Sequence, residues 1–305
     1  MLDLRSLEVF YWVATLSGFR RAAEKLHMTQ PAVSARIAQL EEALDCRLLD
    51  RSKAGAVLTA KGIELLGYAE RMLKLHSEMV MALGPASGVR GTVRLGVSET
   101  IVHTWLSDLL KKIHAIYPKV TIEIEVDVSG VLRDQLVSGE VDVALLLGPV
   151  SAPRIKNLPI CDYPLRCFAS PALDLPDRVV TAAELLAHPI ITYSRVTRPY
   201  LELMERLATG STRGPRVFAN SSLSSIVRMT LDGIGVGVVA EVAIREERHS
   251  GRLRLVRTEF DADMPRLSYT ASIMDRPDNL LASAVAALAQ STAAAWEREP
   301  PAGPA

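Results

Sequence analysis

The sequence predicts a small helical N-terminal domain followed by a two-lobed α/β domain. Up to residue 83 the apolar residues recur at helical spacing, and only one short hairpin pattern interrupts them. From residue 92 onward, strand-like and helix-like runs alternate in βαβαβ order, which predicts a parallel sheet with right-handed crossovers. A second α/β run between residues 162 and 263 is followed by one strand and one helix. Two lobes with a ligand cleft between them are therefore expected.

Composition and charge restrict the class of protein. The 35 basic and 35 acidic residues give a formal net charge of zero, so nucleic acid would have to be bound by a local patch. Cys46, Cys161 and Cys167 lack C-x-x-C spacing, which argues against a disulfide framework and against a zinc site. The N-terminus has no basic leader, and no run approaches about 18 apolar residues. We therefore expect a cytoplasmic protein that does not contact a membrane.

Three helices are expected before the hairpin. Ser17-Gly18 separates the first helix from the second, which covers residues 19–26. Thr29 is a good N-cap for the third helix, residues 29–44, and Pro31 falls in its first turn, where a missing N–H costs nothing. Four apolar residues share its inward face: Val33, Ile37, Leu40 and Leu44. Five small or polar residues point away from that face: Gln30, Pro31, Ser34, Ala35 and Ala38.

The outward face of the third helix suits double-stranded DNA. An α-helix fits the major groove, and short polar side chains at its start reach base edges, as the Gln30 amide would with adenine. Basic residues nearby would contact phosphates or the minor groove. The predicted DNA-binding residues are Thr29, Gln30, Pro31, Ser34, Arg36, Arg51 and Lys53. Taken alone, the helix fits a purely structural role equally well.

A wing and a long helix complete the N-terminal part. Apolar pairs at 48–49 and 57–58 flank a polar segment and predict a two-stranded wing. One helix, capped by Thr59, is expected from residue 59 to residue 83. A spacing close to 3.5 residues predicts a coiled-coil seam and a homodimer, formed by Leu66, Ala69, Leu73, His76, Val80 and Leu83. The alternative is a helix packed on its own domain. Residues 84–88, GPASG, predict a hinge.

The C-terminal part divides into two lobes. Strands are expected at 92–97, 120–126 and 141–148, with helices at 101–117 and 131–138. Five runs of the second lobe have strand character: RCFAS, PIITYS, RVFANS, GVGVVA and LRLVRT. A strand at 267–273 and a helix at 280–297 follow. The predicted domains are the winged domain 1–58, the linker helix 59–84, the hinge 85–91, lobe I with 92–161 and 265–305, and lobe II with 162–264.

Residues 4–66 resemble the winged helix-turn-helix of LysR-type transcriptional regulators. The matching positions are Phe10, Ala22-Ala23, Leu26, Gln30 to Ser34, Ile37, Leu40-Glu41, Leu44, Leu48, Arg51, Leu58-Thr59 and Gly62. The runs LVSGEVDVAL (136–145) and LDGIGVGVV (231–239) resemble the family's effector domain, so the resemblance covers nearly the whole chain. Four positions depart from the family: Asp45 replaces a glycine, Leu49 a phenylalanine, Ala54 a basic residue and Ala240 a proline.

The resemblance implies an effector domain folded like a periplasmic binding protein, with a small molecule between its lobes. Transferred by position, the effector-binding residues are Ser98, Thr100, Ser129, Ser194, Arg195 and Ser222. Hydroxyls and free N–H groups at helix starts suit a carboxylate, so an anionic or aromatic-acid effector is expected. Each serine suits a plain N-cap as well. For Arg195 and Arg198, contact with the anion and an ordinary surface position remain alternatives.

The expected function is an effector-responsive transcriptional regulator that binds double-stranded DNA. The resemblance further implies an interrupted palindrome as the DNA site, a homotetramer, and RNA polymerase as a candidate partner. We expect no enzymatic activity, cofactor or metal, because GVSET (96–100) lacks the closing glycine of a nucleophile elbow and the glycines at 233–237 form GxGxG after a helix. The alternative is a periplasmic-type solute-binding protein, which the absence of an export signal disfavours.

Overall fold

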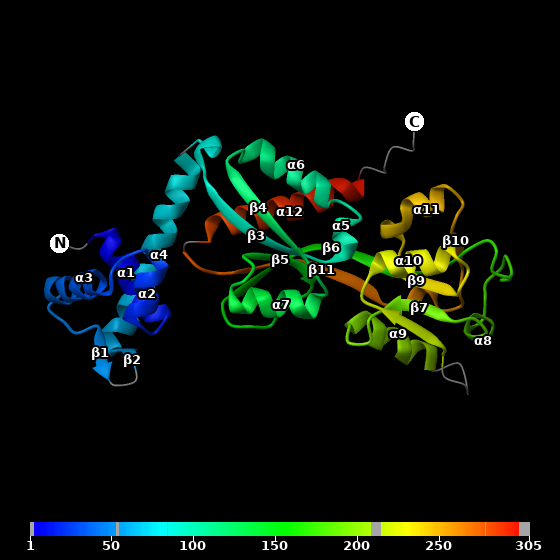
Figure 1. Ribbon diagram of the computed structural model, residues 1–305, viewed down its shortest axis with the longest axis horizontal. Coiled ribbons are helices and arrows are strands. Elements are labelled where there is room, and N and C mark those ends of the chain that lie inside the picture. The colour runs from blue at the N-terminus through cyan, green and yellow to red at the C-terminus, as the bar shows by residue number, and fades with distance from the viewer. Residues whose placement is uncertain (1–2, 53–54, 84, 209–214, 278, 299–305) are drawn as a thin grey trace. The chain divides into compact units, whose positions relative to one another are not determined.

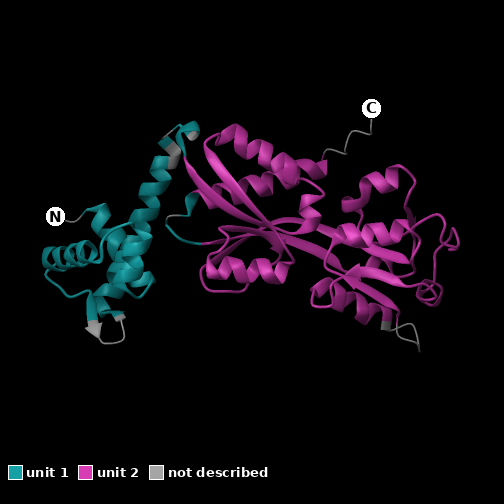
Figure 2. Cartoon of the chain, viewed as in Figure 1, with its two compact units in different colours: residues 1–89, 275–280 teal, residues 90–274, 281–305 magenta. Residues whose placement is uncertain are grey.

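The computed structural model describes residues 3–52, 55–83, 85–208, 215–277 and 279–298. The chain forms two compact units, one of residues 1–89 and 275–280 and the other of residues 90–274 and 281–305 (Figure 2). Each unit has a hydrophobic core of its own.

The N-terminal unit has the predicted order of three helices, a hairpin and a long helix (Figure 1). Its helices are α1 (Leu4–Thr15), α2 (Phe19–Lys25), α3 (Gln30–Ala43) and α4 (Ala60–Leu83). Its wing pairs two antiparallel strands, β1 (Leu49–Ser52) and β2 (Gly55–Leu58). Phe10 and Tyr11 of α1 are buried with Val33, Ile37 and Leu40 of α3. The apolar faces seen in the sequence therefore build this core.

The end of α3 differs from the prediction at Leu44. This residue was expected to be buried, but it is 37% exposed. Asp45 follows it with φ of +46°. The N–H of Cys46 donates to the carbonyl of Glu41 at 3.1 Å, and the N–H of Asp45 donates to the carbonyl of Glu42 at 3.2 Å. These bonds form a Schellman motif, whose left-handed residue turns the chain away from the helix axis. Leu44 therefore does not continue the buried face.

The start of α4 approaches the chain before the wing closely. As predicted, Thr59 caps the helix: its hydroxyl accepts the N–H of Gly62 at 3.0 Å and donates to the carbonyl of Arg47 at 2.7 Å. A Cβ at Gly62 would lie 2.1 Å from the carbonyl oxygen of Leu48. Only a glycine allows this approach.

The predicted seam of α4 divides between two environments. Ala69 is fully buried, and Leu66 and Leu73 pack on the core of their own unit, as the alternative interpretation required. The later members of the predicted seam are exposed: His76, Val80 and Leu83. The continuous seam predicted from spacing is therefore wrong in its first half, because the core of the winged domain already covers those residues. Gly84 of the predicted hinge lies outside the described residues.

The C-terminal unit is built on a mixed sheet of nine strands in the order β4-β3-β5-β11-β6-β9-β7-β8, with β10 beside β6 (Figure 1). The strands are β3 (Gly91–Val97), β4 (Val120–Val126), β5 (Val143–Leu147), β6 (Ile155–Ala169), β7 (Ile190–Tyr193), β8 (Val217–Asn220), β9 (Val236–Ala240), β10 (Arg254–Val256) and β11 (Arg266–Met274). The predicted parallel pairing holds within each lobe, for β3 with β4 and β5 and for β7 with β8 and β9. Strands β6 and β11 run antiparallel to their neighbours.

The two long strands β6 and β11 connect the lobes. The first part of β6 pairs with β11, and its later part pairs with β9 and β10. The sequence predicted only its last residues as a strand, because Pro159 and Pro164 interrupt the pattern and a proline lacks an N–H for the ladder. Both prolines lie within β6 and face β11 residues. The predicted lobe boundary between residues 161 and 162 falls inside this strand.

Helices cover both faces of each lobe. They are α5 (Glu99–Val102), α6 (Leu106–Ile116), α7 (Ser129–Ser138), α8 (Ala182–Leu186), α9 (Arg198–Ala208), α10 (Leu223–Leu231), α11 (Arg245–His249) and α12 (Leu280–Arg298). The helix expected over residues 101–117 is broken into α5 and α6. At the break, the Thr104 hydroxyl donates to the carbonyls of Thr100 and Ile101 at 3.0 and 3.2 Å. This hydroxyl satisfies carbonyls at the end of α5, and Trp105 next to it is fully buried.

Candidate functional site

The start of α3 presents polar side chains to solvent. The Thr29 hydroxyl accepts the N–H of Ala32 at 3.4 Å, which fixes where the helix begins. Gln30 and Pro31 are exposed and Ser34 is half-buried. Beneath them Val33 and Ile37 of the same helix are 0% and 1% exposed. A buried face thus holds a short polar face outward, which is the arrangement that a groove-reading helix requires.

A buried carboxylate ties α3 to the wing. Glu41 is 7% exposed, and its carboxylate accepts the N–H groups of Leu48 and Leu49 at 2.7 and 3.2 Å. Arg47 approaches the same carboxylate at 3.4 Å. The sequence analysis counted Glu41 as a match to the family without giving it a role. Glu41 and the exposed Glu42 both lie between Leu40 and Leu44, so the sequence did not show which of the two acids is buried.

The basic residues predicted to contact DNA have different surroundings. The Arg36 guanidinium lies 3.8 Å from the Asp3 carboxylate, and its side chain is 37% exposed. Asp3 itself accepts the N–H of Ser6 at 2.6 Å and so caps α1. Arg51 belongs to β1. Lys53 lies outside the described residues.

A pocket of about 300 Å³ lies between the lobes of the C-terminal unit. Four of the predicted effector-binding residues line it: Ser98, Thr100, Ser129 and Ser222. Its apolar walls come from Val126, Val128, Leu147, Leu223 and Leu267. Six further polar residues that the sequence analysis missed complete the lining: Glu99, Asp127, Tyr193, Thr197, Ser221 and Tyr269. We call this cavity the hydroxyl pocket.

The hydroxyls of this pocket are held by the ends of the lobe I strands. Ser129 accepts the N–H of Leu147 at 3.0 Å, and its oxygen lies 3.3 Å from that of Ser98. Ser98 precedes α5 without a side-chain capping bond, whereas Ser222 accepts the N–H of Ser225. The N-cap interpretation therefore accounts for Ser222 but not for Ser98 or Ser129.

Two tyrosines in the lining remain protonated at neutral pH. Burial raises the pKa of Tyr193 to about 12, with Thr100 partly opposing the shift. Burial also raises the pKa of Tyr269 well above its ordinary value. Both phenols can therefore donate a hydrogen bond to a ligand.

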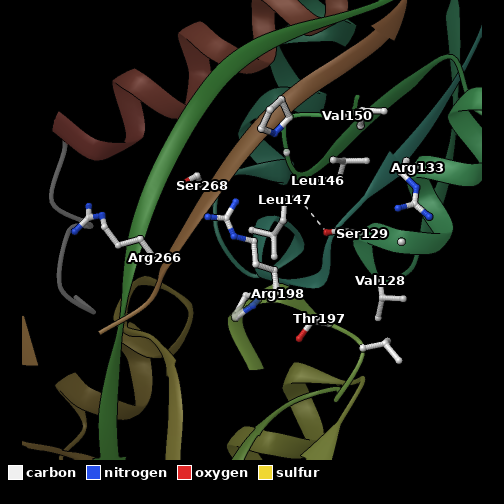
Figure 3. A pocket seen from close by; sticks show the side chains of 15 residues that line it. Val128, Ser129, Arg133, Leu146, Leu147, Val150, Thr197, Arg198, Arg266 and Ser268 are labelled. Carbon is white, nitrogen blue, oxygen red and sulfur yellow. Dashed lines mark hydrogen bonds between the residues drawn. The ribbon is translucent and has the colours of Figure 1, made fainter. Parts of the chain in front are cut away.

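A second cavity of about 290 Å³ adjoins the hydroxyl pocket and carries three arginines. The two cavities share Val128, Ser129, Leu147 and Thr197. Arg133, Arg198 and Arg266 line the second cavity, which we call the arginine pocket, and Figure 3 shows Arg198 and Thr197 facing the same space as Ser129 and Leu147. Arg198 is also paired with Glu202 at 2.6 Å. Arg133 and Arg266 also pair with acids, Asp134 and Asp162, so the positive charge on this side of the cleft is partly compensated.

Two predicted effector-binding residues are not among those that line either pocket. The carbonyl of Ser194 accepts the N–H and the hydroxyl of Thr197, at 2.9 and 2.6 Å, and Arg195 is exposed. The polar residues that line the arginine pocket from this turn are Thr197 and Arg198, beside Val196 and Pro199. The tight turn after β7 therefore brings Thr197 and Arg198 to the pocket in place of Ser194 and Arg195, three residues earlier. Transfer by position along the chain does not reveal this shift.

The N–H groups at the start of α10 were expected to be free for an anion, and they are not. The carboxylate of Glu99, from α5, accepts the N–H of Leu223 at 2.5 Å and that of Ser224 at 3.1 Å. It also accepts the hydroxyls of Ser224 and Ser222 at 2.9 and 3.3 Å. An acid of the chain itself therefore occupies this helix start.

Two family models match the chain in tandem. The bacterial regulatory helix-turn-helix protein, lysR family, matches residues 4–63, and the LysR substrate binding domain matches residues 86–297. The chain belongs to the LysR family. It is therefore an effector-responsive, DNA-binding transcriptional regulator. The solute-binding alternative is not supported, because it leaves the helix-turn-helix match without a role.

Individual LysR-family relatives cover most of the chain. The HTH-type transcriptional regulator BbuR of Bordetella bronchiseptica is 29% identical over 256 residues, which are 83% of this chain and 78% of the relative. A probable RuBisCO transcriptional regulator of Thalassiosira pseudonana is 25% identical over 90% of this chain and 92% of its own. These relatives are regulators by name, as the sequence analysis expected for this chain.

Solved structures share the fold of this LysR-family chain. A full-length OxyR variant from Pseudomonas aeruginosa has a TM-score of 0.57 at 23% identity, covering 96% of this chain and 100% of its own. Full-length LysG from Corynebacterium glutamicum with bound effector Arg has a TM-score of 0.59 at 16% identity, covering 96% and 99%. Within the part of our chain that the structure describes, no helix is long and apolar enough to span a membrane, and no cluster of metal-binding side chains occurs.

Proposed function

We propose that the start of α3 reads base edges in the major groove through Gln30 and Ser34, with Thr29 and Pro31 setting how the helix begins. The observation that carries this proposal is the exposed polar face of α3 directly above its buried one. Arg36, Arg51 and Lys53 supply sequence-independent contacts to the DNA backbone. Affinity from such contacts falls as the salt concentration rises.

Two copies of the chain pair through α4. Tyr68, Met72, Leu75 and Met79 follow one another at steps of four, three and four residues, and each is at least 44% exposed. This spacing forms a coiled-coil seam, rotated around the helix from the seam that the sequence predicted. Substitution Leu75→Glu puts a charge into this seam, and we expect it to break the α4 pairing, so that analytical ultracentrifugation shows a smaller assembly than that of the wild type.

Pairing of α4 places two α3 helices on successive major grooves of an interrupted palindrome. Half-sites must then lie on one side of the duplex, about 10 base pairs or a multiple apart. Adding about 5 base pairs between the half-sites turns one of them to the far side. Fluorescence anisotropy with DNA selected by the protein should show weaker binding after this half-turn insertion and recovery after a full turn. Equal binding at both spacings would contradict the paired arrangement.

The effector binds in the hydroxyl pocket with its acidic group in the arginine pocket. The hydroxyls of Ser98, Thr100 and Ser129 supply directional hydrogen bonds, and Arg198 supplies positive charge. A library of small carboxylic acids tested by thermal unfolding should contain a compound that stabilises the full chain. We expect Ser98→Ala to reduce that stabilisation and Ser138→Ala, at the exposed far end of α7, to leave it unchanged. Equal reductions in both variants would exclude Ser98 from the site.

Assembly and cellular context follow from the family. We propose a homotetramer of two α4-paired dimers in the cytoplasm, with RNA polymerase as a further partner at the promoter. The effector shifts the arrangement of the tetramer by its differential affinity for two arrangements. No catalytic step is part of this proposal.

A further inference from the structure

All three N–H groups of the first turn of α10 have acceptors. Those of Leu223 and Ser224 donate to Glu99, and that of Ser225 donates to the Ser222 hydroxyl. The first N–H groups of a helix have no partner within the helix and carry its positive dipole end. A carboxylate is the charge complement of such a site. No backbone N–H of residues 223–225 is therefore left to bind a second anion.

The carboxylate that fills the site comes from the other lobe. Glu99 is the first residue of α5, directly after the β3 strand of lobe I, whereas α10 belongs to lobe II. The Glu99 side chain is 25% exposed. His103, on the next turn, contributes a second bond across the cleft, with its Nε2 3.1 Å from the Ser224 hydroxyl. The covalent connection between the lobes runs through β6 and β11, so these contacts form a separate bridge at the pocket wall.

Glu99 and part of the helix start that it contacts also line the hydroxyl pocket. Glu99, Ser222 and Leu223 are all part of that lining. A change in the distance between the lobes would therefore change both the pocket and the bridge. Burial alone would raise the pKa of Glu99, but the N–H groups of Leu223 and Ser224 lower it below its ordinary value, so the carboxylate is ionised at neutral pH.

We propose that Glu99 is an internal ligand of the α10 start, which holds the two lobes together before any effector binds and excludes the effector's acidic group from that helix end. Near Glu99 the effector then makes hydrogen bonds and apolar contacts. Its negatively charged group lies on the side of Arg198. The bridge between the lobes does not depend on the proposed DNA and effector functions, whereas the side from which the effector's charge enters rests on the proposed effector site.

Removal of the carboxylate should create an anion site that the wild-type protein lacks. In full-length Glu99→Ala, we expect the melting temperature to fall by about 4–8 °C, since charge-assisted bonds between the lobes are lost. Sodium formate, added at constant ionic strength against sodium chloride, should restore part of this loss in Glu99→Ala. It should have no effect on the wild type or on Glu125→Ala, a control at an exposed acid of β4.

Hydrogen exchange locates the effect. The amides of Leu223 and Ser224 should exchange at least about tenfold faster in Glu99→Ala than in the wild type, and formate should slow them again. If Glu99→Ala does not fold, the comparison uses hydrogen exchange in Glu99→Gln alone, because its amide removes the charge but still fills the site and leaves no space for formate. Equal formate responses in wild type and variant, or unchanged exchange at these two amides, would overturn the proposal. A failed effector or DNA experiment would leave these readouts unaffected.

Discussion

The starts of α3 and α10 differ in what occupies them. Both were predicted from sequence as helix starts that face a ligand, α3 toward DNA and α10 toward an anion. At α3 the exposed Gln30 and Pro31 leave the surface open. At α10 the Glu99 carboxylate takes the N–H groups of Leu223 and Ser224. A polar helix start is therefore a binding site only where the rest of the chain does not supply the ligand.

The two helix starts also differ in how far along the chain the residues that contact them lie. At α3, Thr29 caps a helix that begins at the next residue. At α10, the decisive partner is 124 residues away from Leu223. Local sequence signals reveal the first kind of contact and cannot reveal the second.

The largest expected effect tests the support beneath the α3 start. Ile37 is 1% exposed in the core, so Ile37→Ala should lower the free energy of unfolding of the N-terminal unit by about 2–5 kcal/mol. Ala38, the next residue, is exposed, and Ala38→Ser should change it by less than about 0.5 kcal/mol. Urea denaturation measures both. Similar losses in the two variants would mean that the faces of α3 are wrongly assigned.

A smaller effect is expected where α3 meets the wing. Glu41→Ala leaves the N–H groups of Leu48 and Leu49 without their acceptor, which should cost about 1–3 kcal/mol. Glu42→Ala, at an exposed neighbouring acid, is the matched control. The melting temperature of Glu41→Ala should be clearly lower than that of Glu42→Ala. Equal melting temperatures would contradict the role of Glu41 in anchoring the wing to α3.

The contacts of Glu99 with the start of α10 should make a pH-dependent contribution to the free energy of unfolding. The folded pKa of Glu99 is lowered, so its stabilisation is present above the unfolded pKa, which for glutamate is about 4.3, and is lost as the pH falls through the folded pKa. The stability difference between wild type and Glu99→Gln should therefore shrink from pH 6 to pH 3. A difference that stays constant over this range would contradict an ionised bridge.

Four other titratable groups lie near Glu99 and need a control. The Nε2 of His103 lies 3.7 Å from the Glu99 carboxylate, and Asp127, Tyr193 and Tyr269 line the same pocket. With its pKa raised to about 12, Tyr193 does not titrate below neutrality. Burial also raises the pKa of Tyr269, so it does not titrate there either. Repeating the pH series in His103→Asn and Asp127→Asn backgrounds removes the other two groups, and the stability difference should still shrink toward pH 3.

The smallest predicted change is a gain in stability at the end of α3. Asp45 has φ of +46°, which costs a residue with a Cβ about 1 kcal/mol relative to glycine. Asp45→Gly should therefore raise the free energy of unfolding by about that amount. Asp45→Ala keeps the Cβ and should give no gain. If both variants lose stability, the aspartate side chain itself contributes to the turn.

The parts of the structure that could be predicted are those whose conformation depends on residues close together in the sequence. Thr29, Pro31 and the row Val33, Ile37 and Leu40 were sufficient to predict α3 and its two faces. The exposed seam of α4 could not be predicted, because apolar spacing does not show that Ala69 is already covered by the core. The length of β6 was missed because a proline in an isolated pattern argues against a strand, while tertiary pairing tolerates it.

The candidate sites follow the same rule. Ser98, Thr100, Ser129 and Ser222, which were transferred from the family by position, line one pocket. Thr197 was missed, and for Arg198 contact with the anion and a surface position were left as alternatives, because the turn after β7 sets which residue reaches the cleft. Glu99 was missed because its partners lie in the other lobe.

Base preference at the α3 start tests the central claim most directly. Bound sequences would be selected from randomised duplex DNA by the wild type, by Gln30→Ala and by Gln39→Ala, the last at an exposed glutamine later on the same helix. An open, reading α3 start predicts that Gln30→Ala loses the preference for one base in each half-site, a discrimination of about 1–3 kcal/mol, while Gln39→Ala keeps the wild-type preference. Identical preferences in all three proteins would contradict the account.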